Sequence, residues 1–355
     1  MNLRKPVLTS IGTSVPPYVI SQEQTDRLMT ENYKNELSAR SFDVLHQVLR
    51  HPSVQKRYVS VTSENELVSL KNEDPDRRIA RFTEWAVRLC CEALGRALDK
   101  AEMSIGSVST LIVNTCTGYI CPGIATYVLE QTGLARSTPV YDLVGAGCGG
   151  AVPALQLAAS IVRGDPDAVV ACIAVEISSA TFEMGNDVGL IVSNAIFGDG
   201  AAAAIVTGKD NGLTLEATAS AFYPESRDYV RFEYKSGRLH NKLDAQLPKV
   251  IRNTVPDFIK GLLAKKSLSV DDVEYWALHP GGDRILTAIQ EELCLTNDDL
   301  TVTRDVLANF GNMSSPTVFF VLERLMQAGF SKDAWCMMAA YGAGMSIHGF
   351  LLRNN

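Results

Sequence analysis

The sequence repeats one short plan in each of its halves, and this repeat restricts the fold more than any other feature. Residues 142–158 (DLVGAGCGGAVPALQLA) and 305–322 (DVLANFGNMSSPTVFFVL) share an apolar strand, a turn of small residues, a proline in the first helical turn and an apolar helix. Residues 172–179 and 336–344 are also similar to each other. We therefore predict an internal duplication of two α/β halves.

Strand-like and helix-like segments alternate in both halves, as expected for an α/β architecture. Short apolar runs closed by glycine predict buried strands, and helical spacing of apolar residues predicts helices. The turn-rich stretch 208–212 (GKDNG) separates the halves, so we expect an N-terminal half at 1–208 and a C-terminal half at 209–355. In the first half we expect helices within 21–103 and at 123–132 and 151–164, and strands at 110–118, 139–147, 168–178 and 201–208. In the second half we expect strands at 212–222, 273–282 and 303–310, a helix at 244–265, a long helix after Gly311 and two strands within 335–353.

Composition argues against several classes of protein. The formal net charge of −7 disfavours a nucleic-acid binder, which needs a basic surface. The eight cysteines lie mostly in apolar stretches and form no C-x-x-C pair, so we expect reduced thiols and no metal site. The opening residues lack the apolar region of a secretory signal, and no apolar run reaches the length of a membrane span. These features predict a cytoplasmic protein without membrane insertion.

The glycine-rich loop at 144–154 has two interpretations. Gly145, Gly147 and Gly150 spell G-x-G-x-x-G between a strand and a helix, and Glu176 ends the next strand, as in a dinucleotide site of an oxidoreductase. However, the motif lies mid-chain, and Pro153 and a cysteine crowd the place where pyrophosphate would bind.

The second interpretation makes Cys148 a nucleophile. A helix N-terminus offers unpaired N–H groups and the positive end of the helix dipole, and both favour a thiolate. Such a thiol needs a base and donors for a developing oxyanion. His279 ends a strand at a glycine turn, and Asn312 occupies the turn that corresponds to Cys148 in the second half. Each residue alone has a structural explanation, but the duplication brings all three to one cavity.

These residues resemble a known family. Cys148 in VGAGCGG, FGDGAAAAIV at 197–206, His279 in HPGG, Asn312 in GNMSSP and YGAGMS at 341–346 are similar, in the same order, to the chalcone synthase-like, or type III, polyketide synthases. The resemblance implies a thiolase fold, in which duplicated αβαβα halves form a five-layered core, and a homodimer. It also implies acyl-CoA and malonyl-CoA as substrates and no further cofactor.

The resemblance also assigns roles to residues. Cys148 would carry the acyl group, while His279 and Asn312 would bind the malonyl thioester and stabilise its enolate. Phe197 would be the gatekeeper between the CoA tunnel and the cavity, and Lys56 and Arg57 would meet the CoA phosphates. The cavity would also involve Cys116, Thr117 and Asn241 and the glycine-rich bend with Gly342 and Gly344.

Asn241 stands near a position where plant members have phenylalanine, and Gly-Ala-Gly replaces their common Gly-Pro-Gly, which favours a microbial-type enzyme. A ketoacyl synthase III is the alternative within the superfamily, although its histidine is typically followed by Gln-Ala-Asn. A thiolase would need a second catalytic cysteine, and Cys336 precedes the bend where that cysteine would belong. A nucleotide-linked oxidoreductase remains the alternative of a different class. The starter and product stay open.

Overall fold

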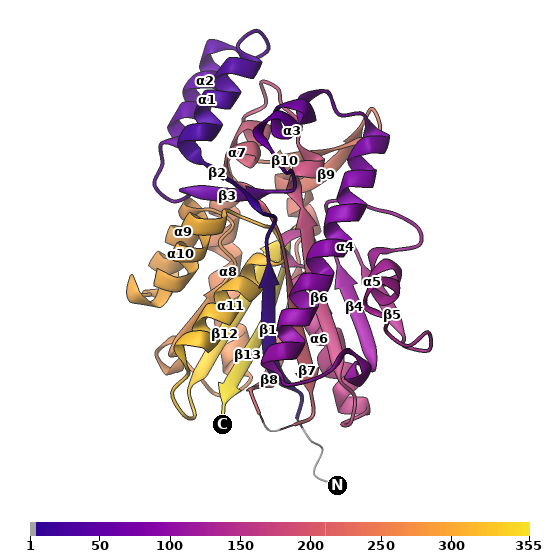
Figure 1. Cartoon of the computed structure of the whole chain (residues 1–355). Helices are drawn as coiled ribbons and strands as arrows, with labels where there is room; N and C mark the ends of the chain where they lie inside the picture. The colour runs from indigo at the N-terminus through magenta and orange to yellow at the C-terminus, as the bar shows by residue number, and fades with distance from the viewer. Residues whose placement is uncertain (1–4, 210) are drawn as a thin grey trace.

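The computed structural model describes residues 5–209 and 211–355. Within these residues, nine strands form one mixed sheet in the order β11-β12-β13-β8-β1-β7-β6-β4-β5 (Figure 1). The first half of the chain supplies β1 (Val7–Ser14), β4 (Thr110–Asn114), β5 (Val140–Leu143), β6 (Val170–Ile177) and β7 (Asp199–Thr207). The second half supplies β8 (Leu213–Phe222), β11 (Tyr275–Leu278), β12 (Trp335–Gly342) and β13 (Ser346–Asn354).

The two halves of the sheet are joined edge to edge by β1 and β8. Their pairing is short, with Val7 opposite Thr214 and Leu8 opposite Leu213. The expected division at 208/209 falls between β7 and β8. It stays a prediction, and residue 210 of the turn-rich stretch lies outside the described residues.

Helices complete a five-layered, thiolase-like arrangement (Figure 1). The outer layer on the first half-sheet consists of α4 (Pro75–Lys100) and α5 (Ile124–Thr132). The middle layer consists of α6 (Ala151–Gly164) and α11 (Thr317–Ala328), each of which contacts strands of both half-sheets. The second half-sheet is covered by α8 (Leu247–Ala264), against which α9 (Asp283–Leu293) packs.

The largest outer helix, α4, shows how local sequence produces this packing. Asp74 caps its N-terminus by accepting a hydrogen bond from Arg77 N, and Pro75 occupies the first turn, where its missing N–H costs nothing. The helix lies directly on β1, because a Cβ at Gly12 would come within 2.3 Å of Ala97 N and 2.4 Å of Ala93 O. Only glycine permits that approach.

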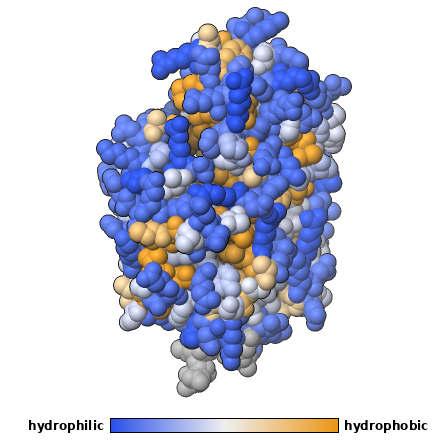
Figure 2. All heavy atoms as spheres, turned by 90° about the vertical axis from the view of Figure 1, so that its left-hand side faces the viewer, coloured by the Kyte–Doolittle hydropathy of each residue, from blue (hydrophilic) through white to orange (hydrophobic). Residues whose placement is uncertain are grey.

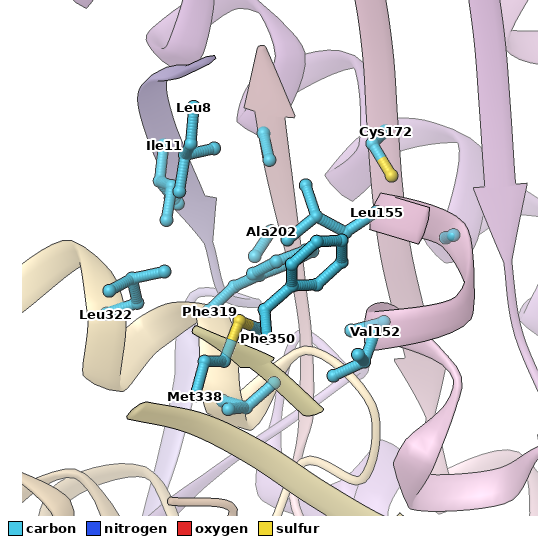
Figure 3. Packing of buried hydrophobic residues seen from close by; sticks show 14 of the residues in the cluster. Leu8, Ile11, Val152, Leu155, Cys172, Ala202, Phe319, Leu322, Met338 and Phe350 are labelled. Atoms are coloured by element: carbon cyan, nitrogen blue, oxygen red, sulfur yellow. The ribbon is translucent and has the colours of Figure 1, made fainter. Parts of the chain in front are cut away.

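The core between the half-sheets surrounds the middle helices. Phe319 of α11 and Phe350 of β13 are fully buried there, beside small residues such as Ala202 and Ala204 of β7 (Figure 3). Small side chains on β7 leave room for large ones from the helices, which gives the dense packing that stabilises a core. The middle layer thereby fixes α6 and α11, whose N-terminal ends carry two predicted site residues.

One predicted strand is a helix. Residues 303–310 belong to α10 (Thr301–Phe310), so the prediction of a strand there was wrong. Val302, Val306 and Phe310 recur every four residues, and this helical spacing places apolar groups on one face. Within residues 211–355 of the second half, no strand therefore corresponds to β5. The other expected strands and helices are present with shifted ends, and the middle of the predicted helical region holds β3 (Lys56–Val59).

A further group of elements covers one end of the sheet. It contains β2 (Tyr18–Ser21), α1 (Gln22–Tyr33), α2 (Ala39–Leu49), β3, α3 (Glu64–Ser69), α7 (Val188–Ile196) and the hairpin of β9 (Val230–Lys235) and β10 (Arg238–Leu243). These elements lie together at the top of Figure 1. Among the described residues, no helix combines the length and apolar character that crossing a membrane requires.

Candidate active site

Several strands end at one cavity of about 580 Å³, a volume typical of small-molecule sites. Cys116 and Thr117 follow β4, Cys148 follows β5, His279 follows β11, and β12 ends at Gly342. All five residues line this cavity together with Asn312, which precedes α11. The carboxyl ends of parallel strands are the usual position of ligand sites in α/β sheets. Residues from both halves of the chain thus meet in one place.

Cys148 lies in a short helical turn, η3 (Gly147–Gly149), just before α6. Gly147 has a φ of +54°, which favours glycine, and Gly149 N donates to Ala146 O at 3.2 Å. The end of β12 presses on this turn, since a Cβ at Gly342 would lie 2.3 Å from Ala146 O and 2.4 Å from Gly149 N. These glycines therefore allow the backbone of β12 to pack directly against the turn that carries Cys148.

Gly344 has a different requirement from Gly342. Its φ of +102° is accessible mainly to glycine, while the space around it is open. Its N–H donates to Val230 O at 3.1 Å, which connects the glycine-rich bend to β9. The bend thus joins the cysteine turn to the hairpin that covers the cavity.

His279 is held by its main chain, and its ring is left free. Its N–H donates to Ala339 O at 2.9 Å, and its carbonyl oxygen accepts a hydrogen bond from the Tyr341 hydroxyl. The Tyr341 ring packs edge-on against the imidazole with 5.5 Å between ring centroids. Neither ring nitrogen has a hydrogen-bond partner among the described residues, and burial lowers the pKa of His279 to about 3.

Asn312 has a fixed side-chain orientation. Ser314 N donates to its Oδ1 at 2.7 Å, and its Nδ2 donates to Gly281 O at 3.3 Å, beside the His279 turn. An amide nitrogen carries two hydrogens, so one donor remains for a ligand. Main-chain bonds with Ile196 O and Gly198 N attach Asn312 to the end of α7. Asn312 can therefore act as a preoriented donor.

Protonation differs from the sequence-based expectation of a thiolate. Burial raises the pKa of Cys148 to about 12, and the hydroxyl of Ser314 and the cysteine's own backbone N–H offset this only in part. Burial therefore favours the thiol form of Cys148 and the neutral imidazole form of His279. An imidazole without a partner can accept the thiol proton when a substrate arrives. The site is therefore suited to forming the Cys148 thiolate when a substrate binds.

Glu176 is a site-supporting residue that the sequence analysis assigned to another role. Its fully buried carboxylate accepts hydrogen bonds from Cys116 N at 2.9 Å and Thr117 N at 3.1 Å, and from the Ser315 hydroxyl at 2.7 Å. It therefore holds the 115–117 segment and cannot bind a ribose. This geometry contradicts the dinucleotide interpretation of the glycine loop.

Cys116 faces Ser314, which the sequence analysis did not single out. The Cys116 Sγ lies 3.5 Å from the Ser314 Oγ. The backbone of Ser314 has a φ of +60°, a conformation that residues other than glycine rarely adopt. Such strain at a cavity wall indicates a position held by its surroundings. The serine doublet after Asn312 was the sequence signal that could have revealed it.

Phe197 and Asn241 also line the cavity. Phe197 directly follows α7 and forms an isolated β-bridge with Asn312, whereas Asn241 lies on β10 opposite Phe232 of β9. Phe232 lines the cavity as well, although the sequence analysis did not name it. Strand register across the hairpin brings these two residues together, and no motif in the sequence indicates it.

Arg57 is placed differently from the expectation of a CoA-phosphate ligand. Its guanidinium is buried and donates to Asn194 O at 2.7 Å, to Phe197 O at 2.8 Å and to Thr25 Oγ1 at 3.0 Å. Burial lowers its pKa to about 10. Arg57 therefore anchors the Phe197 segment. Lys56 points the other way along β3, as alternate residues of a strand do, and it is not among the cavity-lining residues.

Within the described residues, no group of three or more His, Cys, Asp or Glu side chains is arranged to hold a metal ion. The cavity is lined by Cys148, His279 and Asn312 from the two halves of the chain, which is the arrangement that the resemblance to condensing enzymes of the thiolase type implies.

Comparisons with known proteins agree with that class. Residues 2–210 match the family model "Chalcone and stilbene synthases, N-terminal domain", and residues 214–355 match the corresponding C-terminal domain. The chain is 26% identical to type III polyketide synthase C of Arabidopsis thaliana over 99% of this chain and 95% of that protein. It is also 26% identical to 1,3,6,8-tetrahydroxynaphthalene synthase of Streptomyces coelicolor over 94% of this chain and 88% of that protein.

Among solved structures, PKS-I of the brown alga Ectocarpus siliculosus superimposes with a TM-score of 0.89 at 25% identity, covering 99% of this chain and 98% of that one. The chain therefore belongs to the chalcone and stilbene synthase family of type III polyketide synthases, which are acyltransferases.

His348 gives the site a measurable pH dependence of stability. Its buried ring packs on Gly149, its Nδ1 lies 2.8 Å from Ser220 Oγ, and burial lowers its pKa to about 4. The unfolded chain takes up this proton near pH ~6.5, so the stabilising contribution is complete above that pH and is lost as the pH falls towards 4. Between these values we expect the wild-type unfolding free energy to fall by about 1.4 kcal/mol per pH unit more than that of His348→Gln. Urea unfolding of both proteins at several pH values measures this difference, and parallel curves would contradict the assignment.

Proposed function

We propose that this chain is a polyketide synthase that loads an acyl group from an acyl-CoA onto Cys148 and extends it with malonyl-CoA. One observation carries the proposal: Cys148, His279 and Asn312 line a single cavity, with the imidazole nitrogens and one amide hydrogen still available. The names of the relatives support the reaction class, because they include synthases of polyketides from plants and bacteria.

Loading begins with proton transfer from the Cys148 thiol to His279. The thiolate attacks the acyl-CoA carbonyl, and the resulting oxyanion is stabilised by donors of the site. As the tetrahedral intermediate collapses, the C–S bond to CoA breaks and the CoA sulfur takes the proton back from the imidazolium. The product is an acyl thioester on Cys148 and free CoA, so atoms and charge balance.

Condensation then uses the same donors on a second substrate. His279 and Asn312 bind the thioester carbonyl of malonyl-CoA, whose decarboxylation releases CO₂ and leaves an enolate. Preoriented N–H groups in a dry cavity stabilise the enolate oxygen. The enolate carbon attacks the Cys148 thioester, the Cys148 sulfur leaves, and a β-ketoacyl-CoA two carbons longer is formed. Repeated rounds and cyclisation would give a pyrone, a resorcinol or a related polyketide.

Replacing Cys148 by Ala tests this proposal. Incubation of the wild type with acyl-CoAs should add the mass of the acyl group at Cys148, and malonyl-CoA should remove that adduct by turnover, without an added cofactor. Cys148→Ala should show neither effect because it lacks the nucleophile. Intact-protein mass spectrometry with peptide mapping measures both. Cys116→Ala is the matched control, since it removes the other cavity cysteine and should still be acylated. Absence of any adduct in the wild type would contradict the proposal.

We further propose that Arg284, in place of Lys56 and Arg57, meets the CoA phosphates. Arg284 is exposed at the start of α9 and lines the cavity, and Gln47 of α2 and His51 just after that helix line it too. Arg284→Ala should raise KM for acyl-CoA roughly 3- to 10-fold and leave kcat unchanged, because a phosphate contact contributes equally to ground and transition states. An acyl N-acetylcysteamine thioester, which lacks the nucleotide, should be used equally by both proteins. Steady-state kinetics test this, with Arg77→Ala as a distant arginine control; an equal loss with both thioesters would refute it.

We also propose a homodimer, supported by the free edge of the sheet. β5 is the last strand in the order; Tyr141 on this strand and Val144 just after it are 43% and 57% exposed. Exposed apolar residues at an unpaired edge favour association with a second copy. Sedimentation equilibrium should give about twice the 38.6 kDa of one chain, and a Tyr141→Glu variant should shift the mass towards one chain. A wild-type mass of one chain at micromolar concentration would contradict the dimer.

A further inference from the structure

Arg57 is a buried cation in the wall of the cavity. Hydrophilic side chains dominate the face of the molecule shown in Figure 2, whereas only 5% of Arg57 is exposed. Burial lowers its pKa to about 10, which still leaves the guanidinium charged at neutral pH. Its hydrogen bonds go to neutral oxygens and not to a carboxylate. Burying a charge in this way is unfavourable, so its position needs an explanation.

The guanidinium binds the C-terminal end of α7. Its Nη1 donates to Asn194 O at 2.7 Å and to Phe197 O at 2.8 Å. Carbonyl groups at the end of a helix lack partners within the helix and carry the negative end of its dipole, so a cation is favourable there. Nη2 donates to Thr25 Oγ1 of α1 at 3.0 Å. Arg57 therefore connects the end of α7 to α1.

The aliphatic part of Arg57 packs against the turn that carries Asn312. A Cβ at Gly311 would lie 2.8 Å from Arg57 Cγ and 3.1 Å from its Cδ. Gly311 also has a φ of +70°, which favours glycine. The methylene groups of Arg57 thus lie directly against the backbone before Asn312, with no side chain between them.

The end of α7 is itself joined to Asn312. The N–H of Asn312 donates to Ile196 O at 2.8 Å, and its carbonyl oxygen accepts a hydrogen bond from Gly198 N at 3.0 Å. Phe197, which lies between these two residues, forms the isolated bridge with Asn312. Arg57 consequently supports Asn312 twice, through its methylene groups under Gly311 and through its guanidinium at the end of α7.

We propose that Arg57 is a positioning residue for the Asn312 amide, and thereby for the decarboxylation of malonyl-CoA and the condensation that follows. This inference rests on the proposed function, in which Asn312 binds the malonyl thioester. The Cys148 turn packs instead on the end of β12 at Gly342. Loss of the Arg57 contacts should therefore impair the malonyl steps and spare loading of Cys148. A role in stability alone would impair both half-reactions together.

Arg57→Lys tests the inference because an ammonium group keeps the charge but lacks the planar fork that reaches three oxygens. We expect decarboxylation of malonyl-CoA to acetyl-CoA to slow roughly 10- to 100-fold, since a small displacement of the amide is costly, and Cys148 acylation to change less than about twofold. Chromatography of the CoA products measures the first rate. Rapid-quench mass spectrometry measures the second, with whichever of acetyl-, hexanoyl- and benzoyl-CoA loads the wild type fastest.

Arg78→Lys is the matched control. Arg78 is also a buried arginine, 7% exposed, but it pairs with Glu183 at 2.6 Å and is not among the cavity-lining residues. It should leave the ratio of the two rates unchanged.

A double variant separates positioning from a general loss of activity. In the Asn312→Ala protein, adding Arg57→Lys should slow decarboxylation by less than about twofold, because the amide that Arg57 positions is already absent. Losses that multiply in the double variant would contradict the inference.

A second pair of variants reaches the same contact from α1. Thr25→Val keeps the shape of the side chain and removes the oxygen that accepts from Arg57 Nη2, whereas Thr25→Ser keeps that oxygen. We expect decarboxylation to slow roughly 3- to 10-fold in Thr25→Val and by less than about twofold in Thr25→Ser. Thermal melting shows whether each variant is folded, and the Thr25 pair decides if Arg57→Lys does not fold.

The outcomes distinguish this inference from the proposed function. Equal losses of acylation and decarboxylation in Arg57→Lys, or unchanged decarboxylation in Arg57→Lys or Thr25→Val, would overturn the inference and leave the proposed function standing. A wild type that neither accepts an acyl group on Cys148 nor decarboxylates malonyl-CoA would refute the proposed function itself.

Discussion

Direct contact between the backbones of the two halves at Gly342 determines where the reactive cysteine lies. A side chain at Gly342 would overlap Ala146 O and Gly149 N, and one at Gly147 would overlap Ala343. The end of β12 therefore touches the Cys148 turn with no side chain between them. Since β12 pairs with β11, which leads into His279, the same contact sets the relation of cysteine to histidine. If β12 lay a few ångströms farther from the Cys148 turn, Cys148 and His279 would no longer keep this relative position.

Main-chain hydrogen bonds position the site residues and leave their reactive atoms free. His279 is attached through its N–H and carbonyl, and Asn312 through its backbone and one amide edge. Burial raises the pKa of Cys148 and lowers that of His279, so it favours the neutral form of each group. Such an arrangement limits side reactions of the thiol.

Sequence reasoning predicted the architecture and the shared cavity of Cys148, His279 and Asn312, because both follow from local signals. Glycine turns after apolar runs mark strand ends, and parallel strand ends meet at one edge. Predictions failed where the local sequence signal was ambiguous, or where contacts with residues distant in the sequence determine the structure. Apolar residues at 302, 306 and 310 fit a helix, but the similarity to 142–158 favoured a strand, and α10 resulted.

Arg57 and Glu176 show the second kind of failure. An arginine beside a lysine resembles a surface pair, and only the fold reveals that carbonyls of the Phe197 segment surround its guanidinium. Glu176 lies at the end of a strand, as a ribose ligand would. However, its carboxylate accepts hydrogen bonds from Cys116 N and Thr117 N, which follow the neighbouring strand. Desolvation is likewise invisible in a sequence, so the helix dipole alone suggested a thiolate at Cys148.

The Cys–His–Asn residues and much of the remaining cavity wall come from different parts of the topology. In the first half, the segment from β2 to α3 is inserted between β1 and α4; in the second, the β9–β10 hairpin is inserted between β8 and α8. These are equivalent points of the duplicated unit, after the first strand and before the first outer helix. The first insertion contributes Ile20, Leu28 and Val68 to the cavity wall, and the second contributes Phe232 and Asn241. Cys148, His279 and Asn312 belong to the duplicated core, so the insertions can change the size and polarity of the cavity without moving these three residues. A family with one reaction and many products follows naturally from this division.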